Sequence, residues 1–180
     1  MKKLLILSCI VTFGLSAKSQ SFKNTSYKNG NGEKVLRLEI RLPVNINTAW
    51  KLFTVDSELK KWIAPLVHIE LKSGGYIITN YDAKKLLTDS SSIKLPIVSF
   101  LKEELLILKV VLNNYFSKSV IEQAEHLQEI IQFNKIDKNN TLITSSMIGW
   151  GSGIDWDKTY DFFVMGNEYT YKELIKNYNK

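Results

Sequence analysis

A glycine-rich turn that runs straight into one long amphipathic segment constrains the fold of this chain more than any other feature. The turn reads Gly-Trp-Gly-Ser-Gly at 149–153 and follows a strand-like stretch at 141–150. At about 100° per residue, one narrow sector of the segment 156–178 collects most of its rings. That sector contains Trp156, Tyr160, Phe163, Asn167, Tyr171, Leu174 and Tyr178. The pattern predicts a long C-terminal helix that packs its ringed face against the rest of the chain.

Upstream of that helix, apolar and polar residues alternate in several short stretches. The clearest is the run Leu-Arg-Leu-Glu-Ile-Arg-Leu at 36–42, which is typical of a strand with one buried face. Two short helices are expected between Asn45 and Pro65. Further strands are expected at 67–71, 76–81, 97–101, 105–112, 127–136 and 141–150. Antiparallel strands with helices packed on one side indicate an α+β domain.

The first residues carry the pattern of a secretory signal peptide. Lys2 and Lys3 precede an apolar run at 4–15 that is too short to span a bilayer, and small residues near Ser19 offer a cleavage site. We therefore expect a signal peptide at 1–19, a flexible polar arm at 20–34 and one folded domain at 35–180. The expected location is the bacterial periplasm or the exterior, with no stable membrane insertion after cleavage. Retention of the segment as a membrane anchor and lipidation at Cys9 stay open as alternatives.

Composition excludes several classes of function. Cys9 is the only cysteine, so the cleaved chain would have no disulfide, thiol nucleophile or thiolate metal site. Three of the 24 basic residues leave with the signal peptide, which leaves 21 against 18 acidic residues and no basic stripe suited to nucleic acid. His68 and His126 lie far apart in the sequence, so we expect no metal site. Neither a catalytic serine, histidine and acid set nor a cofactor motif is legible.

The order of these elements, together with five short motifs, resembles the SRPBCC superfamily of START and Bet v 1-like helix-grip domains. The motifs are Ala-Trp-Lys-Leu-Phe-Thr at 49–54, Leu-Lys-Lys-Trp at 59–62, Leu-Lys-Ser-Gly-Gly at 71–75, Ile-Val-Ser-Phe-Leu at 97–101 and Ile-Gly-Trp-Gly-Ser-Gly at 148–153. They are most similar to the branch related to the heat-shock ATPase activator. The resemblance implies a curved antiparallel sheet wrapped around the long C-terminal helix, with two short helices after strand 1.

The sequence departs from that branch in two places. Residues 116–126 predict an inserted helix where many relatives turn tightly. The signal peptide also contrasts with a branch whose members are mostly cytoplasmic. A cytosolic chaperone-activator role is therefore not expected.

In the superfamily that this chain resembles, the space between helix and sheet often holds an apolar ligand. The resemblance and the ringed helical face together nominate seven residues for such a site: Trp62, Tyr81, Trp150, Tyr160, Phe163, Asn167 and Tyr171. Asn167 stands out because an amide within an apolar stripe costs about 1–3 kcal/mol unless it finds a partner. We expect an exported, non-catalytic protein that binds a small hydrophobic molecule without a cofactor.

Two other functions stay open. The superfamily also contains enzymes of the cyclase or hydrolase kind, in which cavity tyrosines and Asn167 would orient a substrate. Alternatively, the domain would act as a protein-interaction module, as in the chaperone-activator branch. A second apolar patch on the last helix, formed by Phe162, Met165 and Tyr169, is the candidate contact for a homodimer.

Overall fold

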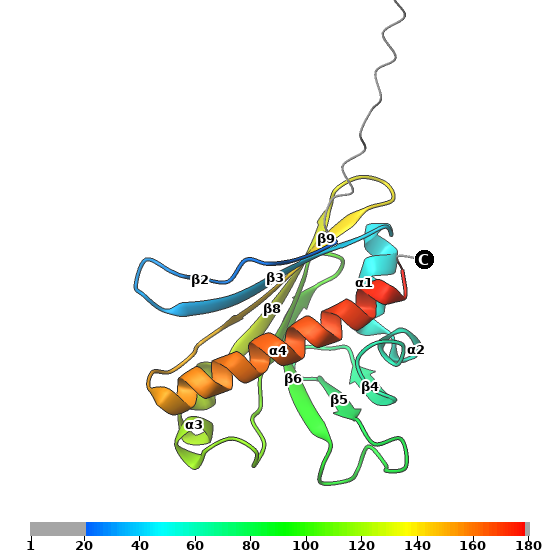
Figure 1. Ribbon diagram of the computed structural model, residues 1–180. Helices are drawn as coiled ribbons and strands as arrows, with labels where there is room; N and C mark the ends of the chain where they lie inside the picture. Colours follow the sequence, from blue (N-terminus) through cyan, green and yellow to red (C-terminus); the bar gives the residue numbers. More distant parts are fainter. Residues whose placement is uncertain (1–20, 179–180) are drawn as a thin grey trace, which may run out of the picture.

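The computed structural model describes residues 21–178. The predicted signal peptide, its cleavage site and Cys9 lie outside the described residues. Within them, an antiparallel sheet curves around one long C-terminal helix, and two short helices follow the first long strand (Figure 1). This confirms the fold class predicted from the sequence. No helix among residues 21–178 combines the length and the apolar character that crossing a membrane needs.

The strands of the described chain form one antiparallel sheet in the order β1-β3-β9-β8-β7-β6-β5-β4, with β2 also paired to β3. The strands are β1 (Phe22–Asn24), β2 (Tyr27–Lys28), β3 (Lys34–Leu42), β4 (Leu66–Glu70), β5 (Tyr76–Asn80), β6 (Ile93–Leu101), β7 (Leu105–Lys109), β8 (Gln128–Lys135) and β9 (Thr141–Ile148). The helices are α1 (Ile46–Thr54), α2 (Asp56–Leu59), α3 (Lys118–Gln123), the short 3-10 helix η1 (Ala124–His126) and α4 (Ile154–Lys176). From β4 to β9 each strand pairs with the next, and β9 then returns to pair with β3.

Apolar and charged residues alternate strictly along β3, so one face of this strand packs into the core. The four apolar residues of the run 36–42 are fully buried, and the charged residues between them point to the other face. Burial of each such side chain contributes about 1.5–3 kcal/mol. Strand β9 pairs along the whole run, from Leu36 opposite Met147 to Leu42 opposite Thr141, so the sequence pattern fixes the register of both strands.

Helices α1 and α2 close one end of the sheet. Asn45 begins α1 by accepting a hydrogen bond from the backbone N–H of Thr48 at 2.9 Å, as a helix-capping residue does. The helix buries Trp50 and Phe53, and each ring meets Phe133 of β8 edge to face at 5.2 Å. Tyr171 near the end of α4 joins this aromatic cluster through Phe53. The cluster therefore ties α1 to the C-terminal end of α4.

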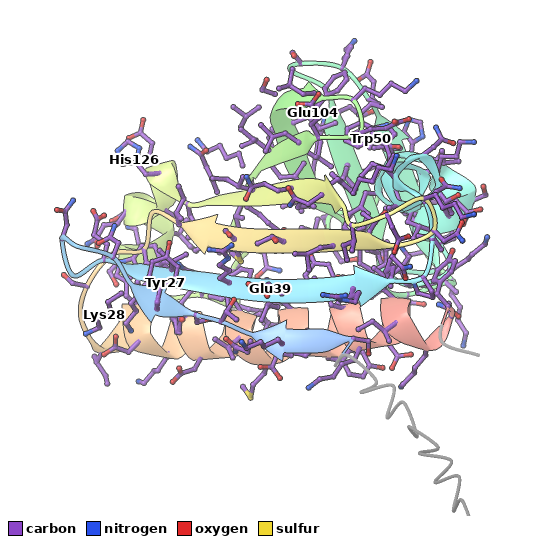
Figure 2. The ribbon with its side chains drawn as sticks, turned by 90° about the horizontal axis from the view of Figure 1, so that it is seen from above. Tyr27, Lys28, Glu39, Trp50, Glu104 and His126 are labelled. Carbon is purple, nitrogen blue, oxygen red and sulfur yellow. The ribbon has the colours of Figure 1, made fainter. Side chains whose placement is uncertain are left out.

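The sequence predicts a flexible arm at 20–34, and the described part of that segment, from residue 21, contradicts this. Strands β1 and β2 lie along β3 and pair with it (Figure 2). Asn24 donates a hydrogen bond to Glu168 of α4 at 2.9 Å, and Lys34 forms an ion pair with Asp157 of α4 at 2.5 Å. A polar, glycine-rich sequence still forms an edge because strand pairing uses backbone groups, which every residue carries.

The inserted helix expected at 116–126 is confirmed as α3 and η1. It lies beside the start of α4 (Figure 1), where Gln123 accepts a hydrogen bond from Trp156 Nε1 at 3.0 Å. Gly149, with a φ of 85°, lies so close to η1 that a Cβ at this position would overlap the carbonyl oxygen of His126. The insertion and the glycine turn together fix where α4 begins.

The other border of the sheet, β4, is covered by a side chain rather than by a strand. Asp56 of α2 accepts a hydrogen bond from the backbone N–H of Ile69 at 2.8 Å through Oδ1. Its Oδ2 lies 2.9 Å from Nδ1 of His68. The backbone N–H of Ile69, at the free edge of β4, therefore already has a hydrogen-bond acceptor within the molecule.

Candidate functional site

A cavity of about 560 Å³ lies between the middle of α4 and the sheet. Its walls come from β5, β6, β7, β8 and β9, from α1 and α2, and from the loops that follow α2, β5 and β7. Small-molecule sites in proteins usually have volumes of about 300–1,000 Å³ and mostly apolar walls with a few polar groups. The volume and the lining of this cavity both fit that description.

Helix α4 is buried at both ends and open in its middle. Trp156 near its start and Leu174 near its end are buried, whereas Phe163, Gly166 and Asn167 between them line the cavity. Gly166 removes a side chain from the wall, and a Cβ added there would meet no atom within 4 Å. The middle of the helix therefore borders open space that its own side chains do not fill.

Eight aromatic residues line the cavity: Phe53, Trp62, Tyr81, Tyr115, Phe116, Phe162, Phe163 and Tyr171. Trp62 stacks on Tyr171 with ring centroids 5.8 Å apart, and Phe116 stacks on Phe163 at 5.7 Å. The indole N–H of Trp62 donates to the backbone oxygen of Leu52 at 3.0 Å, so its polar tip is already satisfied. The walls therefore combine aromatic rings with aliphatic side chains.

One acidic residue, Glu129 of β8, lies within this apolar lining. Its Oε1 accepts two hydrogen bonds, from Ser145 Oγ at 2.6 Å and from Tyr171 OH at 2.8 Å. Two donors on one oxygen are the pattern of a carboxylate in charge-assisted hydrogen bonds. Among the residues that the structure describes, no lysine, arginine or histidine lines the cavity. Among residues 21–178, no three His, Cys, Asp or Glu side chains gather in a way that could hold a metal ion.

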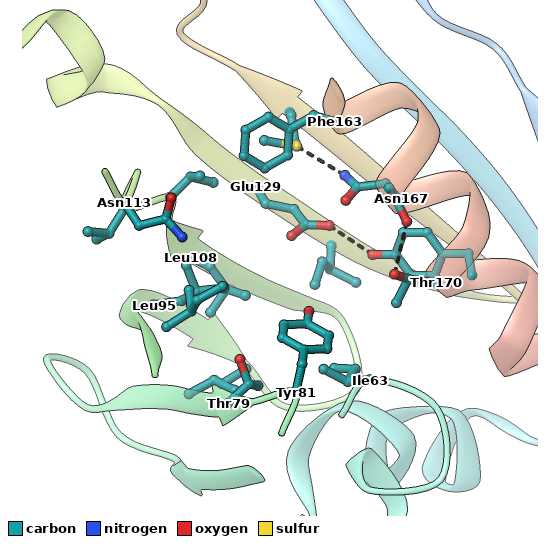
Figure 3. Close-up of a pocket in the computed structure, with 18 of the residues that line it drawn as sticks. Ile63, Thr79, Tyr81, Leu95, Leu108, Asn113, Glu129, Phe163, Asn167 and Thr170 are labelled. Atoms are coloured by element: carbon teal, nitrogen blue, oxygen red, sulfur yellow. Dashed lines mark hydrogen bonds between the residues drawn. The ribbon is translucent and has the colours of Figure 1, made fainter. Parts of the chain in front are cut away.

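Two tyrosines around Glu129 have raised pKa values. Burial raises the pKa of Tyr171 well above its ordinary value, and the adjacent Glu129 raises it further. Burial also raises the pKa of Tyr81, again with a contribution from Glu129, toward which the Tyr81 hydroxyl points (Figure 3). Tyr81 is still 62% exposed, because its ring stands on the wall of an open cavity. Both phenols therefore remain protonated donors near one carboxylate at neutral pH.

Asn167 faces the cavity with only a weak partner. Its amide nitrogen donates to the sulfur of Met147 at 3.1 Å, and a thioether is a weak acceptor. Thr170, which also lines the cavity, donates to the backbone oxygen of Gly166 at 2.9 Å and is satisfied within the helix. Asn167 is thus the side chain of α4 that keeps hydrogen-bonding capacity toward the cavity (Figure 3).

Five of the seven residues nominated from the sequence line the cavity: Trp62, Tyr81, Phe163, Asn167 and Tyr171. The structure does not bring the other two into it. Trp150 and Tyr160 pack edge to face on each other at 5.0 Å, and Nζ of Lys34 lies 4.8 Å from the centre of the Tyr160 ring. The aromatic face of α4 extends beyond the cavity. The first turns of the helix therefore pack on the glycine-rich turn at 149–153 and do not line the cavity.

The apolar patch predicted on the outer side of α4 is exposed. Phe162, Met165 and Tyr169 have 55%, 67% and 68% of their surface exposed. Phe162 also lines the cavity and meets Phe116 edge to face at 5.2 Å. The patch therefore adjoins the cavity rather than lying apart from it.

Glu129 is the charged site residue that the sequence analysis missed. Alternation in the run 127–133 places Leu127, Ile131 and Phe133 in the core, and the same alternation turns Glu129 inward. A charged residue at an inward position of an apolar alternation is a departure from the strand pattern. The inward position of this charged residue is the sequence feature that could have identified Glu129 as a site residue.

No family model matches this sequence, and no curated protein matches it. Solved structures do resemble it. Protein MLL2253 from Mesorhizobium loti has a TM-score of 0.60 at 10% identity, covering 79% of this chain and 94% of that one. The Aha1 dimer from Colwellia psychrerythraea has a TM-score of 0.53 at 12% identity, covering 75% and 92%. Protein NE0264 from Nitrosomonas europaea has a TM-score of 0.56 at 19% identity, covering 79% and 92%.

The chain has the helix-grip fold. This is the fold that the resemblance to the SRPBCC superfamily implied. Sequence identities of 10–19% support a shared fold and say nothing of function, because one fold serves many unrelated functions. Any functional conclusion has to come from the cavity.

Proposed function

We propose that this protein binds a small hydrophobic molecule in the cavity beneath α4. The observation that carries the proposal is an open space of about 560 Å³ at the centre of the fold, walled by rings and aliphatic side chains. A packed interior leaves few voids larger than a water molecule, so a space of this size is unusual unless something occupies it. Burying the apolar surface of a ligand there contributes about 25 cal/mol per Å² removed from water.

The contacts around the cavity favour binding over a structural defect. The rings of Trp62 and Tyr171 stack on each other, and hydrogen bonds from Ser145 and Tyr171 hold the side chain of Glu129 in place. A wall that is fixed before the ligand arrives loses little conformational entropy on binding. The cavity is therefore organised as a site rather than left over between poorly packed elements.

The experiment is binding of Nile red, a neutral apolar dye, followed by its fluorescence, together with native mass spectrometry of the purified protein. Gly166→Phe places a ring in the open space beside Gly166, and we expect it to abolish or strongly weaken dye binding. Gly166→Ala is the matched control, since it also replaces a helical glycine but fills little of the cavity. We expect it to bind the dye and to be more stable by about 0.5–1 kcal/mol.

Two results would contradict the proposal. One is the absence of dye binding and of any co-purifying molecule in the unaltered protein. The other is equal dye binding by the Gly166→Phe variant, because the dye would then sit elsewhere, for instance on the exposed patch of Phe162, Met165 and Tyr169.

An enzyme of the cyclase or hydrolase kind is the second candidate, and one observation favours it. Glu129, Tyr81 and Tyr171 converge on the same cavity, as an acid–base set would. Non-catalytic binding accounts better for the contacts, because Ser145 and Tyr171 both hold one Glu129 oxygen in place. Turnover of a bound molecule that stops in Glu129→Gln while dye binding persists would favour the enzyme.

Export and self-association complete the proposal. We propose that the chain is cleaved near Ser19 and released into the periplasm, and N-terminal sequencing of the protein from that compartment tests this.

We also propose that the exposed patch of Phe162, Met165 and Tyr169 joins two copies of the chain. Light scattering of the Met165→Lys variant against the unaltered protein tests the second point.

A further inference from the structure

We propose that the molecule held in the cavity is an apolar amine, whose protonated nitrogen binds the free carboxylate oxygen Oε2 of Glu129. This inference rests on the proposed ligand-binding function and adds the chemical class of the ligand. It starts from Glu129, the single acidic residue of the cavity within the described part of the chain: one of its carboxylate oxygens accepts hydrogen bonds and the other accepts none.

The hydrogen bonds of Glu129 separate its two oxygens. Ser145 and Tyr171 both donate to Oε1. Within residues 21–178, no donor reaches Oε2, and this atom is not among the buried polar atoms that lack both a partner and solvent contact. Oε2 is therefore open to the cavity, where a ligand can reach it.

The surroundings of Glu129 supply no positive charge. None of the ten ion pairs of residues 21–178 involves Glu129, and no basic side chain lines the cavity. A carboxylate among apolar walls interacts more strongly with a nearby charge than it would in water. A cationic group on the ligand gains from this interaction, whereas a carboxylate on the ligand, such as that of a fatty acid, is repelled.

The rings of the cavity favour the same charge. Ring faces carry partial negative charge, and a cation within about 6 Å of a ring centre is attracted to it. Tyr171 joins the two features, because its hydroxyl bonds Glu129 while its ring stacks on Trp62. Tyr81 points toward Glu129 from the opposite wall (Figure 3). A carboxylate bordered by rings is the arrangement that recognises an ammonium group.

The experiment compares three ligands that share one apolar chain: dodecylamine, dodecanol and dodecanoate, each below its micelle concentration, competing with Nile red. We expect the amine to bind about ten- to a hundredfold more tightly than the alcohol, as hydrogen bonds to charged groups usually contribute. We expect dodecanoate to bind most weakly. The full sequence carries a net charge of +6, and the cleaved chain would keep 21 basic against 18 acidic residues, so general electrostatic attraction would favour dodecanoate and give the opposite order in either form.

Glu129→Gln keeps the shape of the side chain and removes its charge. We expect this variant to lose the preference for the amine over the alcohol and to bind dodecanoate more tightly than the unaltered protein does, with each affinity referred to the Nile red affinity measured for the same variant. Glu104→Gln is the matched control, because it removes one exposed carboxylate away from the cavity lining and should leave the order unchanged.

The outcomes separate the two proposals. Nile red binding without a preference for the amine, or a preference that survives in Glu129→Gln, overturns this inference and leaves the ligand-binding function standing. Absence of Nile red binding in the unaltered protein overturns both. If Glu129→Gln does not fold, the order of the three ligands in the unaltered protein decides the inference by itself.

Discussion

The two ends of helix α4 and its middle are held by different kinds of contact. At the ends, Trp156 and Leu174 have only 3% and 0% of their surface exposed. In the middle, Gly166 and Asn167 border the cavity, and Met165 on the outer side is 67% exposed. The helix is thus fixed where it starts and where it stops, and it spans unfilled space between those points.

This difference separates stability from ligand binding along a single helix. Shortening a side chain in a packed region leaves a void, which costs more free energy than the lost transfer of its atoms alone. In the middle of α4 the neighbouring space already exists, so a similar change removes fewer contacts. Substitutions at the ends should therefore alter unfolding, and substitutions in the middle should alter binding.

The largest expected effect is at the C-terminal end. Leu174→Ala should lower the free energy of unfolding by about 2–5 kcal/mol, because Leu174 is fully buried in the core. Met165→Ala, in the middle and exposed, should change it by less than about 0.5 kcal/mol. Urea unfolding followed by circular dichroism measures both. Similar losses for the two variants would mean that α4 is packed evenly along its length.

The start of the helix can be tested through its glycines. Gly149→Ala should cost about 1–3 kcal/mol for a side chain at φ 85°, with a further loss from the overlap with His126. Gly153→Ala is the control, since its φ is 103° but a Cβ there meets nothing within 4 Å. If both variants lose the same stability in urea, the close approach of Gly149 to η1 does not hold the helix.

The smallest effect is expected where the packed end meets the cavity. Tyr171→Phe removes the hydrogen bond to Glu129 and should cost about 1 kcal/mol at neutral pH. The folded-state pKa of Tyr171 is raised, so in the unaltered protein the unfolded state ionises first and stability falls as pH rises above about 10. Part of that fall should be missing in Tyr171→Phe. Urea midpoints measured across the alkaline range check this, and parallel curves for the two proteins would refute it.

The fold was largely predictable because periodicity reports the buried face directly. The alternation at 36–42 and the ring sector of 156–178 each became the element expected. The edge strands β1 and β2 were not predictable in this way. They pair through backbone groups along β3, and apolar alternation is not needed for that.

The site was predictable only where it follows from the helix. Phe163, Asn167 and Tyr171 line the cavity because they share one face of α4. Trp150 and Tyr160 lie beyond the end of the cavity and pack on each other. The periodicity of the sequence identifies a buried face but does not give the length of a cavity along it. Glu129 escaped notice because an inward carboxylate contradicts the apolar pattern that defines a core strand. Its partner Ser145 lies on the neighbouring strand β9 and its partner Tyr171 on helix α4, and only the folded structure brings the three side chains together.

An open sheet has two borders at which another chain can add a strand and start an insoluble polymer. One border here ends in β1, which is only three residues long and offers little template. At the other border, Asp56 already occupies the amide of Ile69 that an incoming strand would need. A single aspartate outside the cavity thus helps to protect the protein from aggregation along its exposed edge.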